Sequence, residues 1–138
     1  MAYMNQERKT RIAAAVKPIL KKYGLKGSLS VRNHMTICLK ITSGPIDFIG
    51  NSNEVCGRNF YQVQQGFKPN TQGYQDVNVY WCHDHYDGVA KDALLELIVA
   101  LQSAGWYNNT RSEIDYFDTA YYYDINIGSW QKPYHVVR

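Results

Sequence analysis

The chain has 138 residues, of which 45% are apolar and 20% are charged, and its formal net charge at pH 7 is +3. These values are close to the averages of soluble globular domains, and one domain over residues 1–138 can bury enough surface to fold without a disulfide or a metal. The longest apolar run, around residues 93–101, contains Glu96 and is far shorter than the roughly 20 residues that cross a bilayer, so we expect no membrane partner.

The cysteine pattern favours a reducing compartment. The chain has three cysteines, an odd number without CxxC spacing, at Cys38, Cys56 and Cys82. Its first residues lack the apolar core of a signal peptide. We therefore expect a cytoplasmic protein.

Residues 5–23 predict an amphipathic helix, because their apolar side chains recur at the spacing of one helix face. These side chains are Ile12, Val16, Ile19, Leu20 and Tyr23. Asn5 can cap the start of the helix, and Gly24 can follow its end. Pro18 lies inside the helix and lacks an amide hydrogen, so we expect a kink or a split near Lys17.

Two stretches with a period of two residues predict strands at residues 28–32 and 35–42. The polar residues 32–34 between them favour a tight hairpin turn. In the second strand Cys38 alternates with the apolar side chains, so its thiol is expected on the side away from the main core, where it would be partly covered.

Residues 43–75 are rich in Gly, Asn, Gln and Pro and show no sustained period, which predicts a long loop that is either functional or mobile. Alternation at residues 77–82 predicts a third strand. The strongest helical pattern of the chain follows at residues 87–105, with Asp87 as the N-cap.

Gly105 follows the end of this second helix, and residues 120–127 predict a fourth strand that ends before Gly128. The predicted order is α-β-β-β-α-β, with a long loop between the second and third strands. We therefore expect an α+β fold in which an antiparallel sheet of about four strands carries two helices on one face.

Charge is distributed unevenly along the chain: residues 1–40 carry nine basic residues and one acidic residue, and residues 41–138 carry six basic and eleven acidic residues. The basic part predicts a surface that contacts nucleic-acid phosphates. Its candidate residues are Arg11, Lys17, Lys21, Lys22, Lys26 and Arg32. The alternative is that these lysines only solvate the first helix.

The α-β-β-β-α order resembles the double-stranded RNA-binding fold, which supports a contact with RNA or DNA. The long middle loop departs from that fold, and so does the missing lysine cluster at the start of the second helix.

The C-terminal part is acidic and rich in tyrosine, of which the chain has 12. Tyrosines are frequent interface anchors, and carboxylates beside them can meet a basic groove of a partner, so this part predicts a surface for a host protein or nucleoprotein complex. The candidate residues are Tyr116, Asp118, Tyr122 and Asp124. The alternative is that Tyr121 and Tyr123 face the core and only Tyr122 is exposed.

Residues 80–88, YWCHDHYDG, place ligand-type side chains directly before a helix. On an extended backbone His83 and His85 point to the same side and could share a zinc ion, which leaves a metal-dependent enzyme as an alternative. A stable site needs further ligands, for which the sequence offers His34, His135, Cys56 or a carboxylate, none at a recognisable metal spacing. The competing interpretation is the end of a strand followed by the Asp87 cap.

No Walker loop, GxGxxG, GxSxG or HExxH motif occurs in the sequence. We therefore expect no cofactor, and a binding function is favoured over an enzymatic one.

Three stretches carry a resemblance to known proteins: LSVRNHMTICLKITSGPIDFIGN, VYWCHDHYDGVAKDAL and DYFDTAYYYDINIGSWQKPY. They resemble small phage and plasmid proteins that are related to a domain of large polyvalent proteins of mobile elements. The resemblance covers nearly the whole chain, with motifs VRNH, SG-x-IDFI, YW-x-H-x-H and IG-x-W-x-KPY. It implies no particular chemistry, but a counter-defence context: a non-enzymatic inhibitor of anti-CRISPR or anti-restriction type that binds a host macromolecule.

Overall fold

The computed structural model describes residues 3–59, 63–107 and 119–137. Within these ranges the chain forms four helices and a five-stranded sheet. The elements in chain order are α1 (Gln6–Lys22), β1 (Lys26–Arg32), β2 (Thr36–Gly44), α2 (Phe48–Arg58), β3 (Gln75–Val77), α4 (Cys82–His85), α5 (Gly88–Leu101), β4 (Tyr122–Ile127) and β5 (His135–Val136).

The sheet is mixed, so the prediction of an antiparallel sheet is wrong, although the α+β class is confirmed. Its strand order is β1-β2-β4-β3, and β5 pairs with the end of β2. β1 and β3 are antiparallel to their neighbours, whereas β2 pairs in parallel with both β4 and β5. Parallel strands cannot be joined by a tight turn, and the chain returns from β2 to β4 through a long crossover that includes α5.

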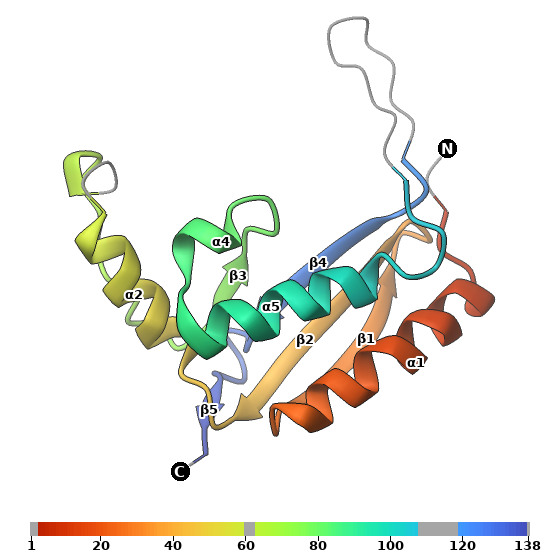
Figure 1. Ribbon diagram of the computed structural model, residues 1–138, viewed down its shortest axis with the longest axis horizontal. Helices are drawn as coiled ribbons and strands as arrows, with labels where there is room; N and C mark the ends of the chain where they lie inside the picture. Colours follow the sequence, from red (N-terminus) through yellow and green to blue (C-terminus); the bar gives the residue numbers. More distant parts are fainter. Residues whose placement is uncertain (1–2, 60–62, 108–118, 138) are drawn as a thin grey trace, which may run out of the picture.

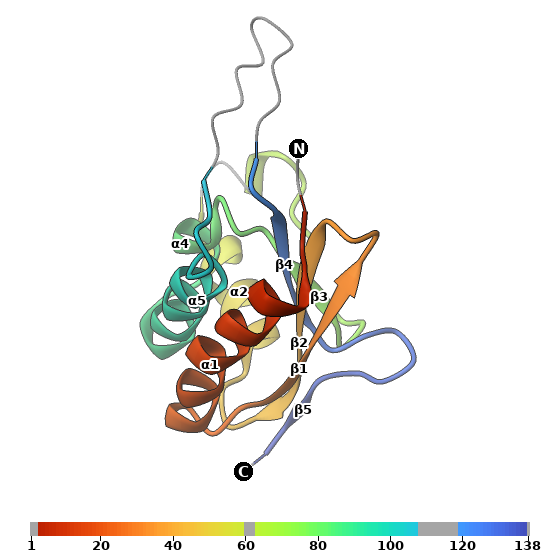
Figure 2. The same ribbon diagram turned by 90° about the vertical axis from the view of Figure 1, so that its right-hand side faces the viewer.

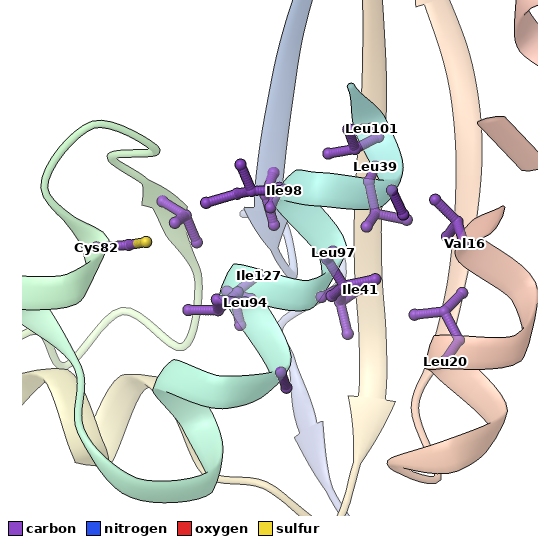
Figure 3. Packing of buried hydrophobic residues seen from close by; sticks show 14 of the residues in the cluster. Val16, Leu20, Leu39, Ile41, Cys82, Leu94, Leu97, Ile98, Leu101 and Ile127 are labelled. Atoms are coloured by element: carbon purple, nitrogen blue, oxygen red, sulfur yellow. The ribbon is translucent and has the colours of Figure 1, made fainter. Parts of the chain in front are cut away.

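The two long helices, α1 and α5, lie side by side on one face of the sheet, as predicted (Figures 1 and 2). Between them and the sheet is the hydrophobic core, in which β2 contributes the fully buried Leu39 and Ile41. Figure 3 shows side chains of both helices, such as Val16 and Leu97, directed towards these residues. Among the described residues, none of the helices combines the length and the apolar character needed to cross a membrane.

Helix α1 runs without a break from Gln6 to Lys22, so the expected split near Lys17 does not occur. Pro18 and Ala14 are both exposed, and water can therefore reach the Ala14 carbonyl that lacks its usual amide donor. The predicted ends of the helix are confirmed: the Asn5 side chain caps the first turn, and Gly24 follows with a φ of +69°.

The hairpin between β1 and β2 is also confirmed. Asn33 and His34 occupy the left-handed region, with φ of 55° and 56°, and the Met35 amide donates to the Arg32 carbonyl at 3.2 Å. Two consecutive residues of this conformation suit the twist of a two-residue hairpin.

The segment predicted as a long loop between the second and third strands contains helix α2. The Asp47 side chain caps this helix by accepting from the Gly50 amide at 2.9 Å. Its buried side chains are Phe48, Ile49, Ser52 and Cys56, of which Phe48, Ser52 and Cys56 recur every four residues. Because Ser52 is polar, this periodicity was too weak to be distinguished from loop composition.

The predicted third strand is shorter than expected and lies earlier in the chain. β3 ends at Val77, and Cys82 to His85 form one helical turn, α4, instead of the end of a strand. The alternation over residues 77–82 was therefore misleading: of the alternating side chains Val77, Val79 and Trp81, only Val77 is buried, and Trp81 is exposed.

Tyr121 connects the start of β4 to the end of α5. Its side chain is fully buried, and its hydroxyl donates to the Leu101 carbonyl at 2.6 Å and accepts from the Ala104 amide at 3.3 Å. The last carbonyls of a helix have no partner within the helix, so this hydroxyl supplies one of the missing bonds.

We predict that Tyr121→Phe lowers the free energy of unfolding by about 1–3 kcal/mol, because a buried carbonyl and a buried amide lose their partner. Urea denaturation measures the effect. The matched control is Tyr122→Phe, at the neighbouring exposed position, which should change stability by less than about 0.5 kcal/mol. Equal stability of the two variants would contradict the role assigned to Tyr121.

Candidate functional site

A cavity lies at the edge of the sheet, at the point where β3 ends and β4 continues. The β3–β4 register stops at Val77 opposite Ile125, whereas β4 begins three residues earlier, at Tyr122. Figure 1 shows β4 extending past β3 towards the N-terminus of the chain. Within the described part of the chain, residues 122–124 therefore have no strand partner on this edge.

The chain turns away from β4 at Asn78. The Asn78 side-chain oxygen accepts from the amides of Tyr80, at 3.1 Å, and Trp81, at 3.3 Å. Such a side-chain bond to the following backbone stabilises a turn and competes with continuation of the strand. The strand pairing consequently opens into a gap between residues 78–80 and β4.

This gap is a cavity of about 390 Å³, within the range of ligand pockets. Side chains on both sides of it are aromatic, and two of them are well exposed: Tyr80 by 72% and Tyr122 by 46%. We call the cavity the aromatic wedge and define it by Asn78, Tyr80, Trp106, Tyr122, Tyr123 and Asp124.

Within the wedge, Trp106 and Tyr123 are held in place by hydrogen bonds and by contact with each other. The Trp106 indole donates to the Tyr121 carbonyl at 2.9 Å, and its ring meets the Tyr123 ring edge to face, with centroids 5.7 Å apart. The Tyr123 hydroxyl accepts from the Gln102 amide group at 3.0 Å. Burial raises the pKa of both Tyr121 and Tyr123, so each phenol stays protonated at neutral pH.

Of the predicted acidic and tyrosine-rich surface, Tyr122 and Asp124 belong to the wedge. Tyr116 and Asp118 lie outside the described residues. Tyr121 is fully buried and Tyr123 is half-buried, which leaves Tyr122 as the exposed member of this tyrosine run. The alternative interpretation of the run, two tyrosines inside and one outside, is therefore the correct one.

Three of the six predicted basic residues are engaged within the chain. Arg11 donates to the Ser103 carbonyl at 3.4 Å, Lys22 pairs with Glu96 at 2.9 Å, and Arg32 pairs with Asp124 at 2.5 Å. The side chains of the other three make no hydrogen bond or ion pair among residues 3–59, 63–107 and 119–137: Lys17, Lys21 and Lys26.

The Arg32–Asp124 pair shows that the basic and acidic parts of the chain meet on one face of the sheet. This is the face opposite to the helices, where Cys38 lies next to Asp124 in the register of β2 and β4. Cys38 points away from the core, as predicted, but it is buried and its sulfur lies 4.0 Å from an Asp124 oxygen. Burial raises the pKa of the Cys38 thiol, which therefore stays protonated.

His83 and His85 do not lie on an extended backbone, so the expectation that they point to the same side is wrong. Both lie in α4, where residues two positions apart differ by about 200° in direction. His83 stacks on Trp81, whereas His85 borders a separate cavity of about 240 Å³. In the described part of the chain, no three His, Cys, Asp or Glu side chains are grouped so that they could hold a metal ion.

Asp87 occupies the N-cap position of α5, as predicted, but its carboxylate makes no cap bond. It accepts from the Asn51 amide group at 2.6 Å and from the Arg58 guanidinium at 2.9 Å, both on α2. These two bonds hold the pKa of the Asp87 carboxyl below its usual value. Asp87 therefore ties α2 to the start of α5.

Sequence reasoning missed three wedge residues as site residues: Asn78, Tyr80 and Trp106. A signal for Tyr80 was present, because Asn78 is a turn-forming residue whose side chain can bond to the backbone two residues on, which ends the strand before Tyr80. No local signal marks Trp106, since its place depends on contacts with the distant residues Tyr121 and Tyr123.

We predict that Trp106→Phe lowers the free energy of unfolding by about 0.5–1.5 kcal/mol, because the ring contact remains but the bond to the Tyr121 carbonyl is lost. Urea denaturation measures the change. Trp130→Phe is the control, since Trp130 is 73% exposed and does not line the wedge. A loss of stability in the control that equals the loss in Trp106→Phe would argue against a structural role of the indole bond.

Comparison with known proteins leaves the wedge to be interpreted from its geometry. No family model matches the chain, and no match was found among curated proteins or among solved structures. The resemblance to phage and plasmid proteins stays a prediction from the sequence motifs.

Proposed function

We propose that this protein is a non-enzymatic binding protein and that the aromatic wedge is its main contact surface. The observation that carries the proposal is a cavity of about 390 Å³ that has the exposed rings of Tyr80 and Tyr122 beside it. Tyrosine and tryptophan bury a large area at a low cost in conformational entropy, and they dominate the energetics of protein interfaces. A protein partner is therefore the best match for this surface.

The strand edge indicates the shape of the partner segment. The Tyr121 carbonyl faces the wedge, because it accepts from the Trp106 indole there. Backbone groups alternate between the two edges of a strand, so those of Tyr123 face the wedge as well. An extended segment of a partner can pair with such an edge while one of its side chains enters the space between the aromatic rings.

We further propose that the partner is a host protein or nucleoprotein complex and that the protein acts in counter-defence, as an inhibitor of anti-CRISPR or anti-restriction type. The support comes from the sequence motifs of phage and plasmid proteins. Tyr80 lies in the YW-x-H-x-H stretch, and Tyr122 and Asp124 lie in the DYFDTAYYYDINIG stretch. Four of the six wedge residues, Tyr80, Tyr122, Tyr123 and Asp124, therefore lie in two of the three segments that carry the resemblance.

The proposal predicts that the double variant Tyr80→Ala, Tyr122→Ala loses a partner that the unchanged protein captures from a bacterial lysate. Truncation of two interface anchors should weaken capture at least about tenfold. The matched control is Tyr3→Ala, Trp130→Ala, which removes two exposed aromatic side chains outside the wedge and should capture the partner normally. Quantitative mass spectrometry of the captured proteins measures the difference.

Capture of the same proteins by all three forms would contradict the wedge as the contact surface, and capture by none would contradict a binding function. The counter-defence part has a separate readout, the transformation efficiency of cells with an active restriction or CRISPR system. Expression of the unchanged protein should raise this efficiency, and expression of the wedge variant should not.

A second candidate function is a contact with duplex RNA or DNA through Lys17, Lys21 and Lys26. The specific observation that favours it is that these side chains have no hydrogen bond or ion pair in the described part of the chain. Unpaired lysines can release counterions from a phosphate backbone when they bind it.

The second candidate predicts salt-dependent binding of a short duplex, measured by fluorescence anisotropy. The variant Lys17→Glu, Lys21→Glu should reduce the slope of log K against log salt concentration by about two, one for each phosphate contact. The charge-matched control is Lys68→Glu, Lys132→Glu, at two exposed lysines outside α1 and β1. Absence of binding at low salt would eliminate this candidate.

A further inference from the structure

Helices α1 and α5 enclose a groove on the outer surface of the helical layer. The helices lie side by side and run in opposite directions, because Lys22 meets Glu96 and Arg11 meets Ser103 (Figure 1). The groove has a volume of about 480 Å³. Its lining is mainly apolar and consists of Ala15, Ile19, Leu95, Glu96, Val99, Ala100 and Ser103.

The exposed side of α5 is unusually apolar for a surface helix. Its inner side chains, such as Leu94 and Leu97, are fully buried in the core. On the outer side, where a surface helix normally carries polar residues, Val99 is 68% exposed and Leu95 is 38% exposed. A helix that is apolar on both sides is typical of an element covered on both sides.

Helix α1 forms the other bank of the groove, and most of its side chains there are small. Ala14 and Pro18 are exposed next to Ala15 and Ile19, which line the groove. Of these four residues, only Ile19 has a large side chain. Small side chains at a helix surface allow the axis of another helix to approach closely. The groove and the surface of α1 beside it can therefore receive a helix from another molecule.

The charges around the groove fit a second copy of this chain. The α1 bank carries Lys21 and the α5 bank carries Asp92. Both residues are exposed, and neither side chain makes a hydrogen bond or ion pair among the described residues. Lys21 is adjacent to Lys22, which meets Glu96, and Asp92 is one helical turn from Glu96, so Lys21 and Asp92 lie at the same end of the groove. A two-fold axis parallel to the groove brings the α1 bank of one copy onto the α5 bank of the other. Lys21 of each copy then faces Asp92 of the other copy.

We propose that two copies of this chain associate through the α1–α5 groove, with Val99 of each copy in the groove of the other and with two symmetric Lys21–Asp92 contacts. Such an isologous contact closes on itself and produces a dimer. It goes beyond the proposed function, because the residues lining the groove and the residues lining the wedge are different.

Sedimentation velocity from micromolar to millimolar protein concentration tests the proposal. The unchanged protein should shift from monomer to dimer as its concentration rises, and Val99→Lys should weaken the dimer at least about tenfold, because it places a charge in the apolar contact. Val89→Lys is the matched control: Val89 is on the same helix, is 55% exposed and does not line the groove, so the dimer should be retained.

Charge reversal tests the two-fold arrangement. Lys21→Glu should weaken the dimer, and the double variant Lys21→Glu, Asp92→Lys should restore it, because each contact is re-formed with its signs exchanged. Circular dichroism confirms that each variant is folded. A monomer at every concentration would overturn the proposal, and so would a Val99→Lys variant that dimerises as tightly as the unchanged protein or as the Val89→Lys control.

Discussion

The parallel pairing of β2 with β4 is the constraint on which the rest of the structure depends. Residues 36–41 pair with residues 122–127, and a parallel pair needs a connection that crosses the sheet. Helix α5 lies in this connection and covers the sheet with the apolar side chains Leu94, Leu97 and Leu101. The bond from the Tyr121 hydroxyl to the Leu101 carbonyl then fixes the end of the helix to the start of the strand.

The aromatic wedge is a consequence of unequal strand lengths at the edge of this sheet. β4 pairs with β2 along its whole length, but β3 covers only its last three residues. Asn78 turns the chain away before the strand pair can be completed, and Trp106 then binds the free edge at the Tyr121 carbonyl. The same arrangement that builds the sheet therefore leaves backbone groups and aromatic rings available to a partner.

The two proposed contact surfaces lie on different parts of the fold. Residues of the wedge lie at the edge of the sheet, whereas residues of the groove lie on α1 and α5. Exposed ion pairs such as Arg32–Asp124 contribute little to stability, but this pair joins the basic and the acidic parts of the chain. The basic and acidic parts of the sequence therefore meet at this pair.

Elements whose pattern is local could be predicted from the residues: α1 with its Asn5 cap, the β1–β2 hairpin, α5 and β4. Side-chain periodicity and turn-forming residues are properties of neighbouring positions, so they can be recognised before the fold is known. The sequence also predicted that Tyr122 is exposed next to Asp124, because the alternation along a strand shows which side chains share a face.

The strand pairing, the parallel direction of β2 and β4, and the replacement of a loop and a strand by α2 and α4 emerged from the folded chain alone. The physical reason is that strand pairing is made by backbone groups far apart in the chain, which side-chain periodicity does not specify. The wedge depends on the same long-range contacts, since Tyr80 and Trp106 meet β4 only after the sheet has formed.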